Sequence, residues 1–377
     1  MTSFSHELLD DPAALVAADR GGLLRALAGA GAQVRRSAET AGEFGLDRLR
    51  DSNTPRAVLV AADSAAPYLS NLLAALASAN APVVDWRDPT LPRWAGPADA
   101  LLAVSADGRH PRLAELVAQA DRRGMVVAVT APARSPVAAA AGRHPVADVG
   151  HLSAVPPRAL WWALATPALQ ALDALGLAST AHLLDRVADS LDQVAETDRP
   201  DSSAYTGPAK LLAAELAESV PVIAGIGQAA TVAARRFAGA VQLIGGSTAM
   251  AAALPDDVAR IGSLLEFAST EADFFADRVT EAAIRPRLVL IGDDDRYGEP
   301  AESSWDGLGD DAGRRAAAAL AGLAASRGIG NSRILVPDAP PLVRFAAASA
   351  TGDFAATYLA LARGIDPCAP RLGELPH

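Results

Sequence analysis

Lysine is almost absent from this sequence. Lys210 is the only lysine among 377 residues, and arginine supplies every other residue of the 33 counted as Lys or Arg. A Schiff-base mechanism, or a phosphate-binding lysine after a glycine-rich loop, therefore has a single candidate. Lys210 stands in GPAKLLAAEL, which is typical of the first turn of an amphipathic helix, and no GxxxxG motif precedes it. The sequence thus supports neither type of lysine site.

Cysteine, aromatic residues and long apolar runs are scarce as well. The one cysteine, Cys368, cannot form an internal disulfide, which predicts a reducing, cytoplasmic compartment. Aromatic residues make up 5% of a chain that is 50% hydrophobic, which favours many helices packed around aliphatic strands. The most apolar stretch, residues 158–178, is interrupted by Arg158, Pro167 and Asp173, so we expect no transmembrane helix. The N-terminus lacks the basic-then-apolar pattern of a signal peptide.

Positive charge is in deficit, with a formal net charge of −11 and an isoelectric point near 5.0. A nucleic-acid-binding protein would show a basic face, and docking on anionic lipid needs a basic cluster. We therefore expect neither nucleic acid nor membrane among the partners. Histidine is also sparse, because none occurs between His182 and His377. The second half of the chain consequently lacks an internal imidazole base.

Two acidic clusters, residues 292–296 and 305–311, are weak candidates for a metal site. Asp293, Asp294 and Asp295 are consecutive, so their side chains diverge, and no histidine is near them in the sequence. We expect a solvated strand end here, and we expect neither a metal nor a cofactor.

Apolar runs alternate with helical patterns twice along the chain, which is typical of βαβ units with a parallel sheet. The first set of expected strands covers residues 56–63, 81–88, 99–105, 125–130 and 144–150. The second set covers residues 220–227, 241–246, 286–295 and 332–338. The polar stretch 196–208 contains Pro200, Gly207 and Pro208, which is typical of a linker. We therefore predict two α/β domains, residues 1–195 and 209–377, joined by residues 196–208.

Four turns follow expected strands, at the edge where open α/β sheets bind ligands. They are ADSAAP (62–67), SADGRHP (105–111), TAPARSP (130–136) and IGQAA (226–230). Glycine is missing from the first, where Ser64 offers a hydroxyl. The polar residues that suit an anion in the second and third are Ser105, Gly108, Arg109, His110, Thr130, Arg134 and Ser135. Taken singly, each turn is typical of a solvated helix cap, whereas for the second and third together ligand binding and a bare turn both stay open. GGS at 245–247 is a further candidate, more typical of a plain turn.

The order of these features resembles the bifunctional glucose-6-phosphate/mannose-6-phosphate isomerases, which are built from two sugar-isomerase (SIS) domains. The resemblance rests on RAVLVAADSAAPYLSNLLAAL, on DALLAVSADGRHPRLAELVAQADRRGMVVAVT, on VPVIAGIGQAATVAARRFAGAVQLIGGSTAMAAALPDD and on YLALARGIDPCAPRLGEL. It implies two SIS-type domains, each a mainly parallel sheet flanked by helices in a flavodoxin-like three-layer sandwich. It further implies a sugar phosphate as ligand and a homodimer.

The same resemblance supplies candidate site residues. The family's Pro-Pro-Arg run matches Pro156, Pro157 and Arg158, which gives Arg158 a catalytic role, with His110 as a substitute base. The expected ligand-binding set is Ser64, Ser105, Asp107, Gly108, Arg109, Thr130, Ser135 and Arg158.

Departures from the family pattern bear directly on chemistry. The catalytic Glu of the family precedes a segment that here begins near Ile244 and Gly245, and Ala259 matches the catalytic His. Aldose–ketose isomerisation passes through an enediol and needs a positioned base. The sequence therefore predicts a phosphosugar-binding protein with lost or altered isomerase activity. An active isomerase interconverting fructose 6-phosphate with glucose 6-phosphate or mannose 6-phosphate is the alternative, and a scaffold that uses the fold for dimerisation is a third hypothesis.

Overall fold

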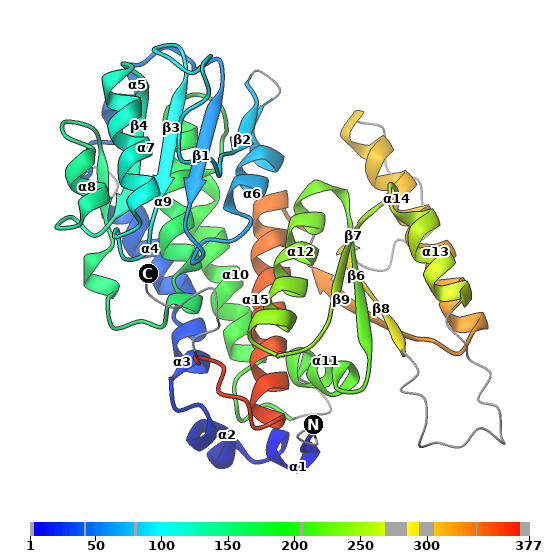
Figure 1. Cartoon of the computed structure of the whole chain (residues 1–377). Coiled ribbons are helices and arrows are strands. Elements are labelled where there is room, and N and C mark those ends of the chain that lie inside the picture. The colour runs from blue at the N-terminus through cyan, green and yellow to red at the C-terminus, as the bar shows by residue number, and fades with distance from the viewer. Residues whose placement is uncertain are drawn as a thin grey trace. The chain divides into compact units, whose positions relative to one another are not determined.

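The computed structural model describes residues 4–40, 43–78, 81–203, 207–267, 285–293, 305–336 and 338–369. It divides the chain into two compact units (Figure 1). One unit comprises residues 25–193, called here the first unit. The second unit combines the residues before Arg25 with those from Val194 to Arg371. Among the described residues, no helix is both long and apolar enough to cross a membrane.

A parallel sheet forms the centre of the first unit. Its strands are β1 (Val58–Ala62), β2 (Val83–Asp85), β3 (Ala100–Val104), β4 (Val126–Ala131) and β5 (Val146–Asp148), in the order β2-β1-β3-β4-β5. All neighbours are parallel, and Leu102 of β3 lies beside Val60 on one side and Ala128 on the other. Every residue of β3 is buried, as expected of a strand covered on both faces.

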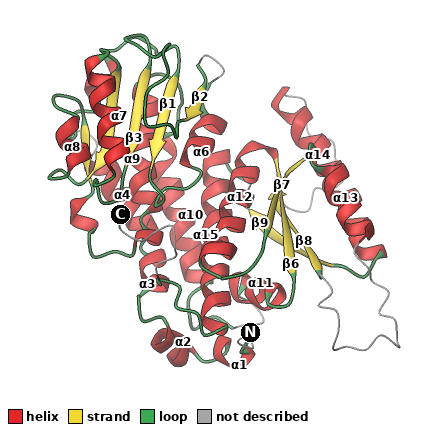
Figure 2. Cartoon of the chain, viewed as in Figure 1, coloured by secondary structure: helices red, strands yellow, loops and turns green. Residues whose placement is uncertain are grey.

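Helices cover both faces of this sheet (Figure 2). Successive strand side chains point to opposite faces. Leu101, Ala103 and Val127 belong to a core that includes residues of α7 and α8, whereas Leu102 and Ala128 face α9. The helices from Leu23 to Thr197 are α3 (Leu23–Ala28), α4 (Ala30–Glu39), α5 (Asp47–Arg50), α6 (Leu69–Leu76), α7 (Pro111–Arg122), α8 (Pro136–Ala140), η2 (Gly150–Leu152), η3 (Pro157–Ala159), α9 (Trp161–Ala174), η4 (Ala181–Leu183) and α10 (Leu184–Thr197).

The second unit holds another parallel sheet, in the order β7-β6-β8-β9. One face packs on α13 and α14 in a core that contains Val222, Leu288 and Leu320. The helices α11, α12 and α15 also contact the sheet, and α11 and α12 each contact α15 (Figure 1). The elements are α1 (His6–Leu9), α2 (Pro12–Ala18), α11 (Pro208–Leu216), β6 (Val220–Ile226), α12 (Gly227–Leu243), β7 (Met250–Leu254), α13 (Val258–Phe267), β8 (Pro286–Asp293), α14 (Trp305–Ser326), β9 (Gly330–Val336) and α15 (Pro341–Ala362).

One strand predicted from the sequence is wrong. Residues 241–246 do not form a strand, because α12 continues to Leu243 with Val241 buried, and the strand that follows is Met250–Leu254. The helix extends one turn further than the apolar run suggested, and Gly246, with φ of +61°, follows the end of that helix.

The leading helices α1 and α2 lie in the second unit, although they are the first elements of the chain. The Ser5 amide donates to the Ala362 carbonyl, at the end of α15, at 2.8 Å. The N-terminal residues are thus attached to the last helix of the fold.

Candidate functional site

Three turns meet at the carboxyl edge of the first unit's sheet. We call residues 63–66 after β1 the first turn, residues 105–110 after β3 the second turn, and residues 132–136 after β4 the third turn. Because β1, β3 and β4 are parallel neighbours, their ends lie side by side. Backbone bonds continue the pairing into the turns, since the Asp63 amide donates to Val104 and the Ser105 amide donates to Thr130.

Asp63 links the first turn to the second. Its Oδ2 atom accepts hydrogen bonds from the Ser105 hydroxyl at 2.9 Å and from the Ala106 amide at 2.8 Å. Its Oδ1 atom accepts one from the Ala65 amide at 2.9 Å. Burial raises the pKa of Asp63 above its usual range, and these three hydrogen bonds oppose the rise. The carboxylate thus takes donors of the kind that a bound anion would use at such a turn.

The second turn is closed by its own side chains. The Ser105 hydroxyl accepts from the Gly108 amide at 2.9 Å, and Asp107 accepts from the Arg109 amide at 2.9 Å. Gly108 has φ of +66°, and a Cβ atom built there would lie 2.1 Å from the Ser135 hydroxyl oxygen. The Gly108 carbonyl also accepts from the Val137 amide at 3.0 Å. The second turn therefore packs directly on the third.

The third turn has its own carboxylate. Asp148, the last residue of β5, accepts from the Ala133 amide at 2.9 Å and from the Gly150 amide at 2.8 Å. Ser135 caps α8 by accepting from the Ala138 amide at 3.3 Å. Each turn of this edge thus has backbone N–H groups bound by an aspartate of the chain.

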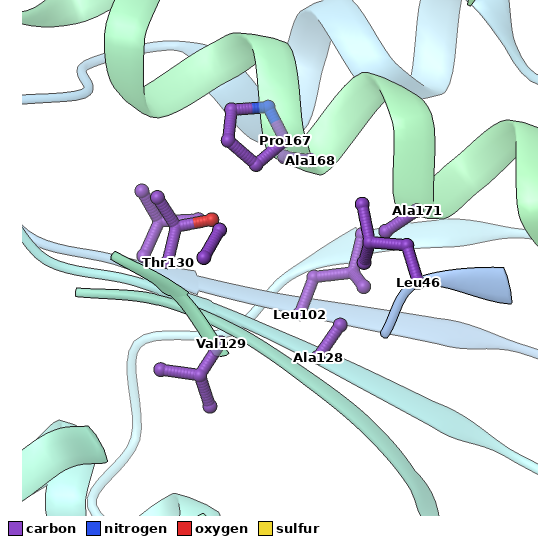
Figure 3. Close-up of a pocket in the computed structure, with 10 residues that line it drawn as sticks. Leu46, Leu102, Ala128, Val129, Thr130, Pro167, Ala168 and Ala171 are labelled. Atoms are coloured by element: carbon purple, nitrogen blue, oxygen red, sulfur yellow. The ribbon is translucent and has the colours of Figure 1, made fainter. Parts of the chain in front are cut away.

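Three of the four expected ligand-binding hydroxyls belong to buried residues. Ser105, Thr130 and Ser135 are 0%, 4% and 6% exposed, and the Thr130 side chain lines an internal cavity (Figure 3). That cavity lies between the sheet and α9 and has a volume of about 10 Å³, which is at the lower limit for one water molecule. This cavity is too small to hold a sugar.

The expected residues that reach solvent are polar or cationic. Ser64, Asp107 and Arg109 are exposed, while His110 and Arg158 are half-buried. His110 is the N-cap residue of α7, and its Nδ1 atom is buried without a hydrogen-bond partner among the described residues. Arg158 lies in η3, after the last strand. The structure brings Ser105, Asp107, Gly108 and Ser135 into one cluster, and the ligand-binding role of the set stays a prediction.

Sequence reasoning missed Asp63 and Asp148 as parts of this edge. In the sequence, Asp63 looks only like the polar stop of a strand, and Asp148 like the interior of one. The available signal was an acidic residue at the carboxyl end of two strands in one parallel sheet, where backbone N–H groups gather.

The corresponding edge of the second unit is built differently. Gly227, with φ of +78°, opens α12 directly from β6, and a Cβ atom on Gly225 would lie 2.3 Å from the Ala230 backbone. Thr231 donates to the Gly227 carbonyl at 2.8 Å. The IGQAA stretch is therefore a tight strand-to-helix junction rather than an open loop.

The positions that the resemblance matches to the family's Glu and His hold apolar side chains. Ile244 is a buried cap residue of α12, and Ala259 lies on α13. Asp257 is nearby in sequence, but hydrogen bonds from Arg260 and the Ala253 amide hold its pKa below the usual range. Among the described residues, no group of three His, Cys, Asp or Glu could hold a metal ion.

Comparison with known proteins agrees with this architecture. Residues 206–371 match the family model of the bacterial phospho-glucose isomerase C-terminal SIS domain. No curated protein matches the chain. A glucose-6-phosphate isomerase-like protein from Thermus thermophilus is 17% identical, with a TM-score of 0.51 over 89% of this chain and 94% of that chain.

Two further solved structures share the fold. A proposed phosphosugar isomerase from Silicibacter pomeroyi is 18% identical, with a TM-score of 0.58 over 92% of this chain and 99% of that chain. The C-terminal domain of glucosamine-fructose-6-phosphate aminotransferase from Francisella tularensis is 11% identical, with a TM-score of 0.54 over 90% of this chain and 95% of that chain.

The chain thus has the two-sheet fold of these proteins. Residues 206–371 match the bacterial phospho-glucose isomerase C-terminal SIS domain, which confirms the resemblance to SIS isomerases.

Proposed function

We propose that this protein binds a sugar phosphate and does not interconvert aldose and ketose, as a diverged relative of the bifunctional glucose-6-phosphate/mannose-6-phosphate isomerases. The SIS domain match at 206–371 supports the ligand class, as do solved structures named for phosphosugar isomerases. We further infer a cytoplasmic homodimer, an inference that rests on the family resemblance and the single cysteine.

One observation carries the loss of isomerase activity: the Asp63 carboxylate at the first unit's sheet edge is already bound. Asp63 accepts three hydrogen bonds from its own chain and holds two turns together, so we do not assign it the role of the base. A general base contributes about 10²- to 10⁴-fold in rate. Ile244 and Ala259 cannot replace the family's Glu and His.

The proposed ligand contacts are basic side chains at the carboxyl edge of the first unit's sheet. Arg109 of the second turn and Arg134 of the third turn are exposed, and His110 is the last residue of the second turn and the N-cap of α7. Guanidinium groups bind phosphate oxygens in a bidentate manner, without the need for free backbone amides. Arg158 is the fourth candidate, inherited from the family's Pro-Pro-Arg run.

A second candidate function, an active isomerase with His110 as base, is favoured by one observation. The Nδ1 atom of His110 is buried without a hydrogen-bond partner among the described residues, so the chain assigns this ring nitrogen no structural hydrogen bond. Histidine is the most frequent general base near neutral pH.

The experiment combines binding and turnover on the purified protein. Fructose 6-phosphate, glucose 6-phosphate and mannose 6-phosphate are each tested for an increase in melting temperature and for interconversion. We expect at least one to stabilise the folded state by mass action, with no turnover. Turnover that Arg158→Ala or His110→Ala abolishes establishes the isomerase instead. Absence of stabilisation by all three sugar phosphates refutes the binding proposal.

A matched pair of arginine variants locates the binding site. Arg109→Ala removes a cation from the carboxyl edge, whereas Arg143→Ala removes an exposed one from the segment between α8 and β5, at the amino edge of the sheet. We expect Arg109→Ala to weaken sugar-phosphate binding about tenfold or more, because a charged hydrogen bond contributes about 1.5–3 kcal/mol. Arg143→Ala should leave it unchanged. Equal affinities for the two variants place the ligand elsewhere.

A further inference from the structure

We propose that Asp63 is a built-in anion that occupies hydrogen-bond donors of the first and second turns and thereby sets the affinity of this edge for oxyanions. The inference rests on the proposed function, because it concerns the same sheet edge and the same ligand class. It goes further by naming one residue that competes with the ligand's phosphate.

The geometry around Asp63 matches that of a bound anion. Donors from two adjacent turns converge on one carboxylate: the Ala65 amide, the Ala106 amide and the Ser105 hydroxyl, all within 2.9 Å. In α/β proteins, the loop between a strand and the N-terminus of the next helix often binds a phosphate. It does so with the same kinds of groups, namely backbone N–H groups and a serine hydroxyl. Here the chain supplies the negative charge itself.

The remaining donors of the second turn are also engaged. The Gly108 amide donates to the Ser105 hydroxyl and the Arg109 amide donates to Asp107. An incoming phosphate would therefore have to break existing hydrogen bonds at this turn. It would also approach two aspartates, and like charges at short range oppose binding.

Tight packing makes the closed arrangement the resting one. Ser105 is fully buried, and the Ser135 hydroxyl stands against Gly108 where no Cβ atom fits. The second turn is thus fixed between its neighbours, which favours pre-formed donor positions rather than a collapsed loop. Removal of the Asp63 charge should therefore leave the donors in place and without their anionic acceptor.

The test measures binding of inorganic phosphate and glucose 6-phosphate by isothermal titration to the full chain. The variants are Asp63→Asn, which keeps the shape and removes the charge, and Asp63→Ser, which also clears the space. The matched control is Asp99→Asn. Asp99 is fully buried, accepts from the Gly96 amide at 2.9 Å and pairs with Arg56, but it precedes β3 at the opposite edge of the same sheet.

We expect both Asp63 variants to bind phosphate at least tenfold more tightly than the wild type, with Asp99→Asn unchanged. An equal affinity for the wild type and a folded Asp63 variant overturns the inference, as does an equal gain in Asp99→Asn. The proposed function fails separately, when the wild type binds no sugar phosphate under any condition tested.

A measurement on the wild type does not depend on the folding of any variant. The amide resonances of Ala65 and Ala106 are followed while phosphate is added. We expect no saturable shift at these two amides, because Asp63 already binds them. A saturable shift at both shows that phosphate displaces the carboxylate readily, and that result overturns the inference.

Discussion

The Nζ atom of Lys210 lies 2.7 Å from the carbonyl oxygen of Leu9, a residue 201 positions earlier in the chain. The same ammonium donates to the carbonyls of Pro200 at 2.7 Å and Ser202 at 2.8 Å, so all three of its protons are used. Its Nζ atom also lies 5.6 Å from the Tyr358 ring centroid. Lys210, which lies in α11, therefore joins that helix to the leading helices and to the stretch that follows α10. All three of its N–H bonds serve this structural role.

Replacement of Lys210 by methionine should destabilise the second unit. Lys210→Met keeps the length of the side chain but leaves three carbonyls without their donor, which we expect to lower the free energy of unfolding by about 2–4 kcal/mol. Chemical denaturation measures the change. The neighbouring Leu211→Ala, at a side chain that is 44% exposed, is the control and should cost within about 0.5 kcal/mol. Similar losses for the two variants would contradict a stabilising role of the ammonium.

A buried ion pair in the same unit offers a second test. Arg236 of α12 donates to Asp353 of α15, and both side chains are at least nine-tenths buried. Arg236→Met strands the carboxylate and should cost about 3–5 kcal/mol. The double variant Arg236→Met with Asp353→Leu should recover much of that loss, because no buried charge remains. Additive losses in a double-mutant cycle would show that the two side chains are not coupled.

Much of the fold was predictable from the sequence, and the reason is periodicity. Continuous apolar runs such as VLVAA and ALLAV, each followed by a helical pattern, indicate buried parallel strands, and the structure confirms them. The error at 241–246 arose because a buried helix end and a buried strand look alike over six residues. The attachment of the leading helices to the second unit could not be predicted, because it depends on long-range contacts such as Lys210 with Leu9.

The candidate site was less predictable than the fold. Serine, glycine and threonine after strands indicated an anion-binding edge, but the same residues also satisfy one another. Only the three-dimensional arrangement shows that Asp63, 42 residues before Ser105, accepts a hydrogen bond from the Ser105 hydroxyl. No local pattern in the sequence distinguishes a serine that faces a ligand from one that faces an internal carboxylate.

Alanine substitutions at Gly108 and Gly142 distinguish the cost of backbone strain from the cost of a steric clash. Both have positive φ, +66° and +57°, so an alanine at either position is strained by about 1–2 kcal/mol. A Cβ atom at Gly108 also meets the Ser135 hydroxyl, whereas nothing lies within 4 Å at Gly142. We expect Gly108→Ala to lower the free energy of unfolding by about 1–3 kcal/mol more than Gly142→Ala. Thermal and urea denaturation measure both, and equal losses would mean that the second and third turns can separate freely.

Asp198 gives the second unit a defined response to pH. It accepts from the Ala209 amide at 2.8 Å, and burial raises its pKa to about 6. The folded state thus retains this proton after the unfolded chain has lost it. The contribution to stability is therefore full below about pH 4 and is lost as the pH rises from there through about 6. The linkage amounts to about 2 kcal/mol between pH 4 and 7.

Asp198→Asn removes this titration. The free energy of unfolding of the variant, minus that of the wild type, should therefore increase by about 2–3 kcal/mol from pH 4 to pH 7. Urea denaturation at a series of pH values measures the difference. The exposed Asp185→Asn controls for the loss of one negative charge. A difference that does not change with pH for Asp198→Asn would rule out a buried, protonated carboxyl at this position.

The five tryptophans are unevenly divided between the two units. Trp86, Trp94, Trp161 and Trp162 belong to residues 25–193, and Trp305 alone belongs to the other unit. Trp161 and Trp162 form an edge-to-face pair at 5.0 Å, and the Trp161 indole donates to the Pro67 carbonyl at 2.9 Å, beside the first turn. Intrinsic fluorescence of the native protein is therefore weighted toward one half of the molecule. Unfolding followed by emission and by far-ultraviolet circular dichroism would give two different midpoints if the halves melt separately.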